Sequence, residues 1–221
     1  MKNRWNKLYE YRWYAILSSL VLLLPMLMGV LFWNGLPEWM PIHWDGAGNP
    51  DGYALKWIGV FVLPLVVLLV HWLGLFLTLH DPGNERQNKK VLGLVFWIVP
   101  VVSLAINGLM YTLAMNHPIP QEQINALIFG LLFVVFGNYM PKIRRNSTLG
   151  IKVPWTLNSD ENWNKTHRFA SKLWIVAGIA ILITAPMPTK IILPVTIVGL
   201  LAAGVIPVIY SYRYARKYES A

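Results

Sequence analysis

The segment 150–168 combines polar side chains that could do chemistry, with a histidine, two acids and two threonines set among tryptophans. His167 and Thr166, with Asp160 and Glu161 upstream, are the types of residue that supply a general base and a nucleophile. On a helix, however, Glu161 lies six residues from His167 and off its face. The HExxH and GxSxG patterns are absent from the sequence. These residues therefore do not favour an enzyme.

A second polar group lies in PIHWDGAGNPDGYALKW, which begins at Pro41. His43, Asp45 and Asp51 could approach one another and hold a cation, but their spacing matches neither a zinc site nor an EF-hand loop. The run from Asn49 to Gly52 is a turn sequence, because proline presets φ and glycine accepts the left-handed region. We therefore favour a folded cap over a metal site, with three tryptophans at the membrane interface: Trp39, Trp44 and Trp57.

Composition places the chain among membrane proteins. Charged residues make up 13% of the 221 residues, whereas soluble domains carry about 25%. Cysteine is absent, which excludes disulfides and cysteine-based metal sites. A spanning helix needs ~20 apolar residues, and six stretches meet or approach that length: 14–33, 57–79, 91–115, 124–140, 173–187 and 191–210. The predicted fold class is therefore all-α, a polytopic bundle of six transmembrane helices.

Two of these spans need comment. The first follows a basic N-terminus, but its apolar run is too long for a signal peptide and no small-residue cleavage site follows, so we expect it to be retained. The fifth is long enough only if residues 169–172 continue the same helix and Lys172 extends to the interface.

Two polar residues lie inside the predicted spans, namely His71 and Asn107. An intramembrane ionisable residue is a functional candidate by default. A neutral histidine can also be satisfied by one carbonyl or hydroxyl, which would make it structural. A proton-coupled transporter would be expected to carry an acidic residue in a span, and none of the predicted spans contains Asp or Glu.

The basic residues predict the orientation in the membrane. Six spans place both termini on one side, and only Lys56 and Lys190 of the 19 basic residues then fall on the other. The positive-inside rule assigns the crowded side to the cytoplasm. We therefore predict a multi-pass protein of the bacterial cytoplasmic membrane with both termini inside. Because the basic residues are spread between apolar runs, we expect no direct nucleic-acid binding.

Two loops between the spans are long enough to hold a site. The first, residues 34–56, is predicted to form an extracellular lid in an N-terminal two-span unit, residues 1–90. The second, residues 141–172, is predicted to be cytoplasmic and to belong to a C-terminal four-span unit, residues 91–221. We call it the signature loop.

The signature loop predicts a helix that runs into the fifth span. Asn158 or Ser159 can cap it, and acidic residues in its first turn suit the helix dipole. One face gathers Trp163, His167, Ala170 and Trp174, and the other gathers Lys165, Arg168 and Lys172. The basic face suits phospholipid headgroups. An interfacial helix that only anchors the bundle is the alternative.

The segment before that helix predicts a tight fold against the bundle. Pro154 favours an extended Val153, because its ring disfavours the helical region for the residue before it. Trp155 would then turn back toward the membrane.

Residues 137–174, GNYMPKIRRNSTLGIKVPWTLNSDENWNKTHRFASKLW, resemble the C-terminal signature of the SdpI/YfhL family of bacterial membrane immunity proteins. The matching parts are the GN and PK pairs, Asn146, the GIK-x-PWTL run, the E-x-W-x-K-THR run and Lys172. The segment that begins at Pro41 is similar to the small N-terminal domain of unknown function in full-length members. Lys152, where the family often has Arg, and Ser171, commonly Gly, are departures from the pattern.

The resemblance implies resistance to a secreted antibacterial peptide toxin of the SDP type, with no cofactor and no catalysis. Some family members also act as a receptor that holds a cognate autorepressor at the membrane. The expected partners are thus the lipid bilayer, from the spans, and the peptide toxin, from the resemblance. A cytoplasmic repressor is the further partner of those members that signal, and the resemblance does not carry that role to this chain. A peptide or small-molecule transporter is the alternative function.

The candidate residues form three sets, with no catalytic, cofactor-binding or metal-ligating residue among them. The first, in and just before the signature loop, is Asn138, Pro141, Lys142, Asn146, Gly150, Lys152, Pro154, Trp155, Thr156, Glu161, Trp163, Thr166, His167 and Arg168. The second, in the outer loop, is Pro41, His43, Trp44, Asp45, Gly48, Pro50, Asp51, Gly52 and Lys56. The third is the intramembrane pair His71 and Asn107.

Overall fold

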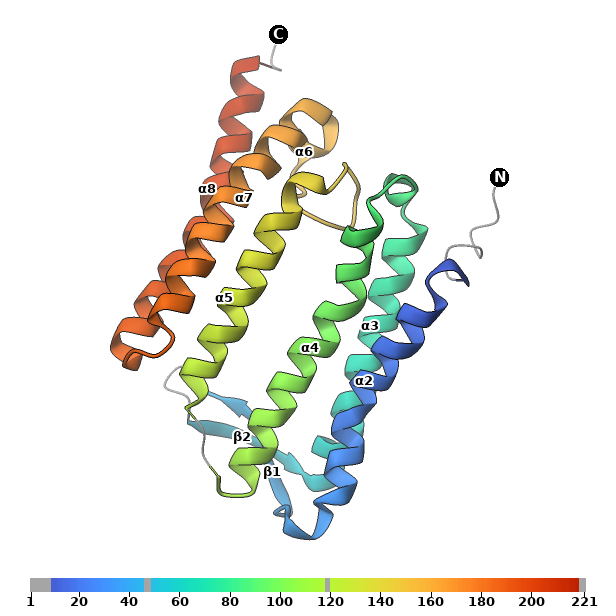
Figure 1. Ribbon diagram of the computed structural model, residues 1–221, viewed down its shortest axis with the longest axis vertical. Coiled ribbons are helices and arrows are strands. Elements are labelled where there is room, and N and C mark those ends of the chain that lie inside the picture. The colour runs from blue at the N-terminus through green and yellow to red at the C-terminus, as the bar shows by residue number, and fades with distance from the viewer. Residues whose placement is uncertain (1–8, 46–48, 118–119, 219–221) are drawn as a thin grey trace. The chain divides into compact units, whose positions relative to one another are not determined.

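The computed structural model describes residues 9–45, 49–117 and 120–218 (Figure 1). Within these ranges six helices are long and apolar enough to cross a membrane. They are α2 (Arg12–Leu31), the π turn η2 (Ile58–Val62) continued by α3 (Leu63–His80), α4 (Lys89–Ala114), α5 (Gln121–Tyr139) continued by η4 (Met140–Lys142), α7 (Asp160–Thr184) and α8 (Thr189–Tyr218). The predicted all-α class with six spans is confirmed.

The fifth helix begins before its predicted apolar run, and the sixth extends beyond its run at both ends. α7 begins at Asp160, so the predicted continuation through residues 169–172 is confirmed. α8 has 30 residues and carries Arg216 and Lys217 in its last turn. The run 173–187 covers only the C-terminal part of α7 and passes its end at Thr184, and the run 191–210 omits the last eight residues of α8. The start of α7 and the end of α8 are polar, so hydropathy alone does not count them as spanning sequence.

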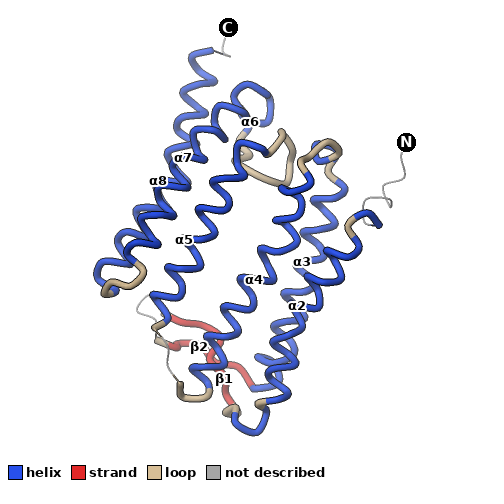
Figure 2. Tube along the Cα trace, in the orientation of Figure 1, coloured by secondary structure: helices blue, strands red, loops and turns tan. Residues whose placement is uncertain are grey.

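The predicted cap over residues 34–56 contains a β-hairpin, which the sequence analysis did not anticipate (Figure 2). The strands β1 (Trp39–Trp44) and β2 (Pro50–Leu55) pair antiparallel, with Met40 opposite Ala54 and His43 opposite Gly52. Pro41 is tolerated because a strand in a two-stranded sheet has an open edge. The helix η1 (Trp33–Gly35) precedes the hairpin.

Packing divides the chain into two compact units. The first consists of residues 1–79 and 92–121, and the second of residues 80–91 and 122–221. The third spanning helix thus packs mostly with the N-terminal helices, while the connection between α3 and α4 packs with the C-terminal ones. The boundary at residue 90 inferred from the sequence stays a prediction.

In the first unit the hairpin rests on a buried apolar cluster. Met40 is fully buried and packs with Leu36, Val60, Met110 and Tyr111. The Tyr111 hydroxyl donates to the Pro25 carbonyl at 2.7 Å, which joins α4 to α2. The lid is therefore part of the core of this unit.

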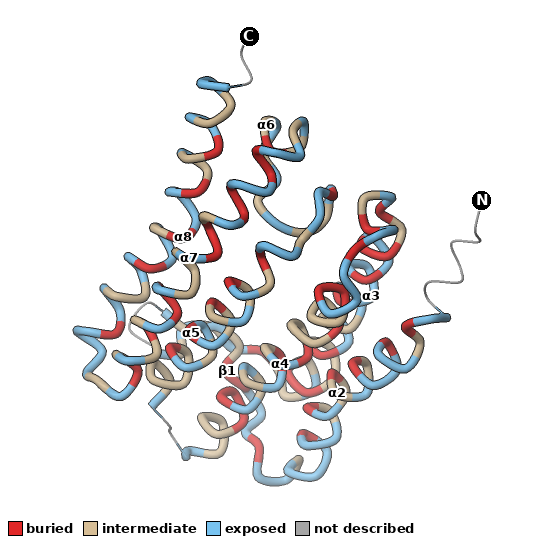
Figure 3. The backbone as a smooth tube through the Cα atoms, turned by 45° about the horizontal axis from the view of Figure 1, so that its top comes forward, coloured by how far each residue is buried: buried red, intermediate tan, exposed pale blue. Residues whose placement is uncertain are grey.

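In the second unit α7 and α8 lie side by side, with buried residues recurring along them between exposed ones (Figure 3). Trp174 of α7 donates its indole N–H to the Ala203 carbonyl of α8 at 3.0 Å. Its ring also stacks on Phe133 of α5, with 4.6 Å between the ring centres. Gly130 and Gly178 let α5 and α7 approach closely, because a Cβ on either would meet the carbonyl of the other.

Candidate functional site

Trp163 and His167 form the buried centre of the signature loop. Their rings stack with centres 4.1 Å apart, and Trp163 is fully buried while His167 is 1% exposed. Residues four apart lie on one helix face, and Ala170 on the same face is also fully buried. The predicted aromatic face of α7 is therefore an inward face.

Two hydrogen bonds hold His167, one that its ring donates and one that its ring accepts. Its Nδ1 lies 2.8 Å from the Trp163 carbonyl oxygen, which can only accept, so Nδ1 carries the proton. Its Nε2 accepts the backbone N–H of Ile151 at 3.0 Å. If Nε2 also carried a proton, that proton would point at the Ile151 N–H, and the hydrogen bond would be lost. The imidazole is thus a neutral anchor for the segment that crosses over it.

Gly150 lies against the edge of the same ring. Its φ of +103° is in the left-handed region that favours glycine. A Cβ at this position would collide with His167 Nε2. The glycine is therefore needed both for the turn and for the close approach that lets Ile151 reach the imidazole.

A short helix, α6 (Pro154–Asn158), follows this turn. Val153 is extended, at φ −118° and ψ 156°, which confirms the conformation expected before proline. Thr156 is fully buried. Its hydroxyl accepts the Val153 N–H at 3.1 Å and lies 2.7 Å from the Ile151 carbonyl. Thr156 thus fastens the start of α6 to the segment that covers His167.

The cap of α7 is Ser159, whose hydroxyl accepts the Asn162 N–H at 3.1 Å. Of the two predicted caps, Ser159 is confirmed. Asn158 is wrong, because it is the last residue of α6.

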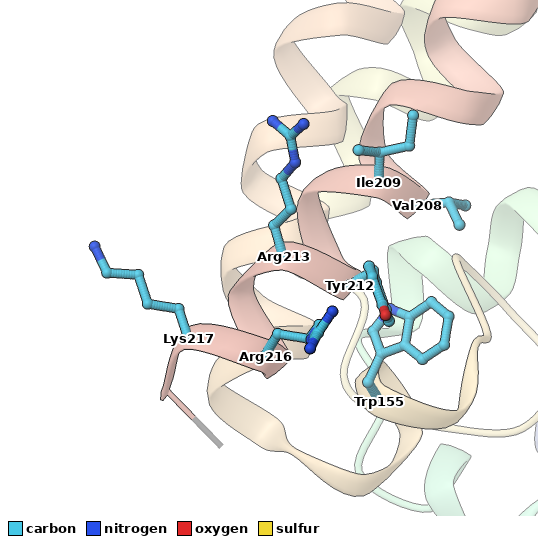
Figure 4. Close-up of a pocket in the computed structure, with 7 residues that line it drawn as sticks. All are labelled: Trp155, Val208, Ile209, Tyr212, Arg213, Arg216 and Lys217. Atoms are coloured by element: carbon cyan, nitrogen blue, oxygen red, sulfur yellow. The ribbon is translucent and has the colours of Figure 1, made fainter. Parts of the chain in front are cut away.

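Ser211 of α8 connects two parts of the signature loop. Trp155 donates its indole N–H to the Ser211 hydroxyl at 2.6 Å, and Asn162 donates to the Ser211 carbonyl at 3.1 Å. Asn162 also accepts the Thr166 hydroxyl at 2.9 Å. Asn162, Thr166 and Ser211 are fully buried. Trp155 was expected to turn back toward the membrane, and in the structure it contacts α8. Its ring also meets the Tyr212 ring edge-on (Figure 4).

The connection between α3 and α4 supplies partners that the sequence analysis missed. Asp81 Oδ2 accepts the N–H of Ser147 at 2.8 Å and its hydroxyl at 2.9 Å. Asn84 donates to the Thr148 hydroxyl at 2.7 Å. Gln87 accepts the backbone N–H of Arg144 at 3.1 Å and donates to its carbonyl at 3.2 Å. The run DPGNERQN, rich in amides within an apolar chain, is the signal that could have identified them.

The Asp81 carboxyl is held as an ionised acceptor. Burial acts to raise its pKa, but hydrogen bonds from Gly83, Ser147 and Thr148 outweigh burial and lower the pKa below its ordinary value of 3.8. The carboxylate therefore remains charged at neutral pH and binds the loop most strongly in that form.

Asn146 shapes the turn that Asp81 holds. Its Oδ1 accepts the N–H groups of Thr148 and Leu149 at 2.8 and 2.6 Å, and its amide donates to the Arg144 carbonyl at 2.7 Å. An asparagine can imitate a backbone turn in this way. Asn146, 4% exposed, is therefore a structural member of the site.

An open pocket of about 520 Å³ lies beside Trp163 on this side of the unit. Arg145 forms an ion pair with Asp160, with 2.6 Å between Nε and the carboxylate oxygen, and also donates to the Leu157 carbonyl at 2.5 Å. The charged residues lining the pocket are Arg86, Arg144, Arg145, Glu85 and Asp160.

Other predicted residues lie outside this network. Glu161 pairs with Lys165 at 3.0 Å on the exposed face of α7 and does not approach His167. Lys152 donates to the Thr148 carbonyl at 3.1 Å, and the Lys142 ammonium lies 4.6 Å from the centre of the Tyr139 ring. The remaining three are exposed: Asn138, Pro141 and Arg168.

On the hairpin, His43 and Asp51 form an exposed pair with 2.5 Å between Nδ1 and the carboxylate oxygen. Asp45 instead accepts the Asn49 N–H at 2.8 Å across the turn. In the part of the chain that the structure describes, no three His, Asp or Glu side chains come together as a metal site. The cation group weighed from the sequence is therefore not assembled by these residues.

The remaining outer-loop candidates support the hairpin. Lys56 donates to the Trp33 carbonyl at 3.0 Å and lies over the Trp33 ring. Pro41 is buried, and Trp44 packs against the Met40 cluster. Gly52 lies against His43, and Pro50 begins β2. Gly48 lies outside the described residues.

Both intramembrane polar residues have local partners. His71 is 2% exposed, and its Nε2 lies 3.0 Å from the Ser18 hydroxyl, which joins α3 to α2. Asn107 donates to the Ser103 carbonyl one turn back in α4 at 2.8 Å. These are the contacts expected of polar groups satisfied within a helical bundle.

Comparison with known proteins confirms the resemblance stated from the motifs. Residues 142–211 match the SdpI/YfhL protein family, and residues 20–68 match a domain of unknown function, DUF1648. The chain is 27% identical over 202 residues to the "Immunity protein SdpI" of Bacillus subtilis (strain 168), a match that covers 91% of this chain and 96% of that protein.

A second relative is the "Uncharacterized membrane protein YbgB" of the same strain. It is 32% identical over 60 residues, which is 27% of this chain and 59% of that protein. No solved structure matches the chain. The six apolar helices and the similarity to an immunity protein identify a multi-pass protein of the cytoplasmic membrane.

Proposed function

We propose that this chain, a relative of the immunity protein SdpI, protects a bacterium from a secreted antibacterial peptide of the SDP type. The observation that carries the proposal is a similarity that spans almost the whole of both chains. It includes the hairpin as well as the signature loop, so it reflects a shared architecture and not one shared motif. Both termini are proposed to be cytoplasmic, with the hairpin outside.

The proposed mechanism is binding of the peptide, which prevents its action. An amphipathic peptide partitions into the bilayer through its apolar area and charge, so it reaches the protein laterally or from the outer surface. The hairpin presents Trp39 and Tyr53, 57% and 55% exposed, and also carries exposed acidic side chains at Asp45 and Asp51. Exposed rings and negative charge suit first contact with a cationic or apolar peptide.

The signature loop is proposed as the responding part of the protein. α3 runs from the π turn that follows the hairpin to His80, and the next residue, Asp81, binds Ser147 of the loop. A bound peptide can shift the loop only if it prefers one of two arrangements of this chain. The arginine-lined pocket beside Trp163 is the surface at which a cytoplasmic repressor would be recruited.

No catalytic step is required by this mechanism. The two ring nitrogens of His167 are occupied by backbone groups of Trp163 and Ile151, and Glu161 is paired with Lys165 on another face. Polar residues of the site thus act as acceptors and anchors.

The proposal is tested by expressing the chain in a bacterium sensitive to an SDP-type peptide and counting survivors after challenge. We expect survival well above that of cells with an empty vector, and peptide recovered from the cells at unchanged mass. Death of both cultures at the same peptide dose would overturn the immunity function. Recovery of cleaved or modified peptide would contradict protection by binding alone.

Export of the peptide is the alternative, and it makes a different prediction. Labelled peptide would accumulate in inside-out membrane vesicles carrying the chain when the vesicles are energised, and collapse of the proton gradient would abolish the accumulation. We expect association with the vesicles to be independent of the gradient.

A further inference from the structure

α7 and α8 form an open groove of about 760 Å³ whose lining is unusually basic. Five cationic side chains contribute to it, namely Lys165, Arg168, Lys172, Arg213 and Lys217. Figure 4 shows Arg213 and Lys217 extending away from Trp155. These two cations and Ile209 also line the neighbouring pocket that Trp155 borders, so the two hollows share one wall of α8. None of the five cations takes part in the hydrogen bonds that hold His167.

The cations of the groove are mostly uncompensated. Lys165 is paired with Glu161 at 3.0 Å and contacts the Tyr214 hydroxyl at 3.1 Å. Within the described ranges, no carboxylate forms an ion pair with the remaining four: Arg168, Lys172, Arg213 and Lys217. Unpaired cations gathered in one groove create a local positive potential that favours an anion.

The groove also changes character along its length. Contacts between α7 and α8 show which residues lie opposite one another along the groove. Lys165 contacts Tyr214, and the rings of Phe169 and Tyr210 stack with their centres 4.5 Å apart. Ile206 and Ile209 line the end nearer the middle of α8. Ile206 lies seven residues, or about 10 Å of helix, from Arg213. One end therefore holds most of the cations, and the other is apolar apart from Lys172.

We propose that this groove binds the headgroup of an anionic phospholipid from the surrounding leaflet. The phosphate would lie among Arg168, Lys172 and Arg213, while an acyl chain follows Phe169 and Ile206 toward the bilayer interior. Lys172 lies at the apolar end, but its long aliphatic side chain lets the ammonium group extend to the depth of the phosphate. Basic pockets between spanning helices suit such headgroups.

The apolar end favours a lipid over a soluble anion or an acidic protein. Ile206 and Ile209 lie in the hydrophobic part of α8, 42% and 46% exposed, where lipid tails are the solvent. A free phosphate would use only the basic end, and a soluble protein would have no access to these side chains. An anionic phospholipid uses both ends.

The test measures lipid retention by the purified full chain with native mass spectrometry, using phosphatidylglycerol and phosphatidylcholine at equal concentration. We expect preferential retention of phosphatidylglycerol, weakened by added salt. Lys172→Gln with Arg213→Gln should reduce that retention roughly tenfold or more, because each basic residue near a membrane surface adds to anionic-lipid binding. Neither residue belongs to the network around His167.

Arg86→Gln with Lys90→Gln is the matched control, because it removes two exposed cations outside the groove. It should retain phosphatidylglycerol as the native chain does. Equal retention of both lipids by the native chain, or displacement by millimolar inorganic phosphate, would overturn the proposal, and neither result depends on a variant folding. Equal loss in the control pair would also overturn it, since net charge alone would then explain the binding.

Discussion

Gly150→Ala adds a single methyl group at the buried centre of the signature loop. Gly150 has a positive φ, and a Cβ would meet His167 Nε2. The strain should destabilise the protein by roughly 1–3 kcal/mol. For a chain of this size that corresponds to an unfolding temperature lower by roughly 3–10 °C, measured on the detergent-solubilised protein.

Gly108→Ala is the control for that substitution. Gly108 lies within α4, where no atom would come within 4 Å of the added Cβ. We expect an unchanged or slightly raised unfolding temperature, because alanine favours a helix by roughly 1 kcal/mol over glycine. Equal losses in both variants would show that the turn at Gly150 is not specially constrained.

Trp155 and Ser211 should be energetically coupled, since the indole N–H donates to the hydroxyl at 2.6 Å. Trp155→Phe keeps the ring but removes the donor, and Ser211→Ala leaves the indole N–H without this acceptor. Unfolding temperatures of both single variants and the double variant should yield a coupling of roughly 0.5–3 kcal/mol. Additive effects would mean that the bond does not hold the loop to α8.

At the residue scale the sequence predicted only part of the site. Helical spacing placed Trp163 and His167 on one face, because α7 is regular. Asp81 and Ser211 were missed, because their partners are 66 and 56 residues away along the chain. A single serine on an apolar helix gives no periodic signal, so such contacts emerge only when the helices are packed.

At the scale of elements, the connection between α3 and α4 should make the signature loop sensitive to acid through Asp81. Its pKa is lowered in the folded state, so its contribution is fully present above the unfolded value of 3.8 and is lost as the pH falls through the lowered folded value. Asp81→Asn should reduce stability at neutral pH by roughly 1.5–3 kcal/mol.

The measurement is the unfolding temperature of native and Asp81→Asn protein from neutral to acidic pH. The difference between them should be largest at neutral pH and shrink below about pH 4. Glu85→Gln, an exposed change in the same connection, is the control and should show little effect at either pH. A pH-independent difference would indicate that the Asp81→Asn substitution perturbs the loop for reasons other than the lost charge.

The helices and the hairpin differ in how well the sequence predicted them. The six helices were predictable because each must satisfy its own backbone in lipid, so length and hydropathy suffice. The hairpin was not, since its strands are six residues each and each contains a proline. Its position is determined by the packing of Met40 on Val60 and Met110. No local sequence pattern predicts that packing.

At the scale of the whole molecule, orientation in the membrane is a prediction of the charge distribution. The chain contains no cysteine, so single cysteines can be introduced without background. Tyr53→Cys on the hairpin and Asn164→Cys on α7 occupy exposed positions. A membrane-impermeant maleimide should label the first in intact cells and the second only after permeabilisation. The reverse pattern would invert the proposed topology.

The central claim is that the signature loop is the working part of an immunity protein, and survival under peptide challenge tests it most directly. Cells would express the native chain, Trp155→Ala, His167→Gln or Gly108→Ala at equal membrane levels. We expect the native chain and Gly108→Ala to protect, while loss of the Trp155 anchor or of the His167 ring that stacks on Trp163 reduces protection. Equal survival of all four strains would contradict the claim and leave the loop as a passive anchor.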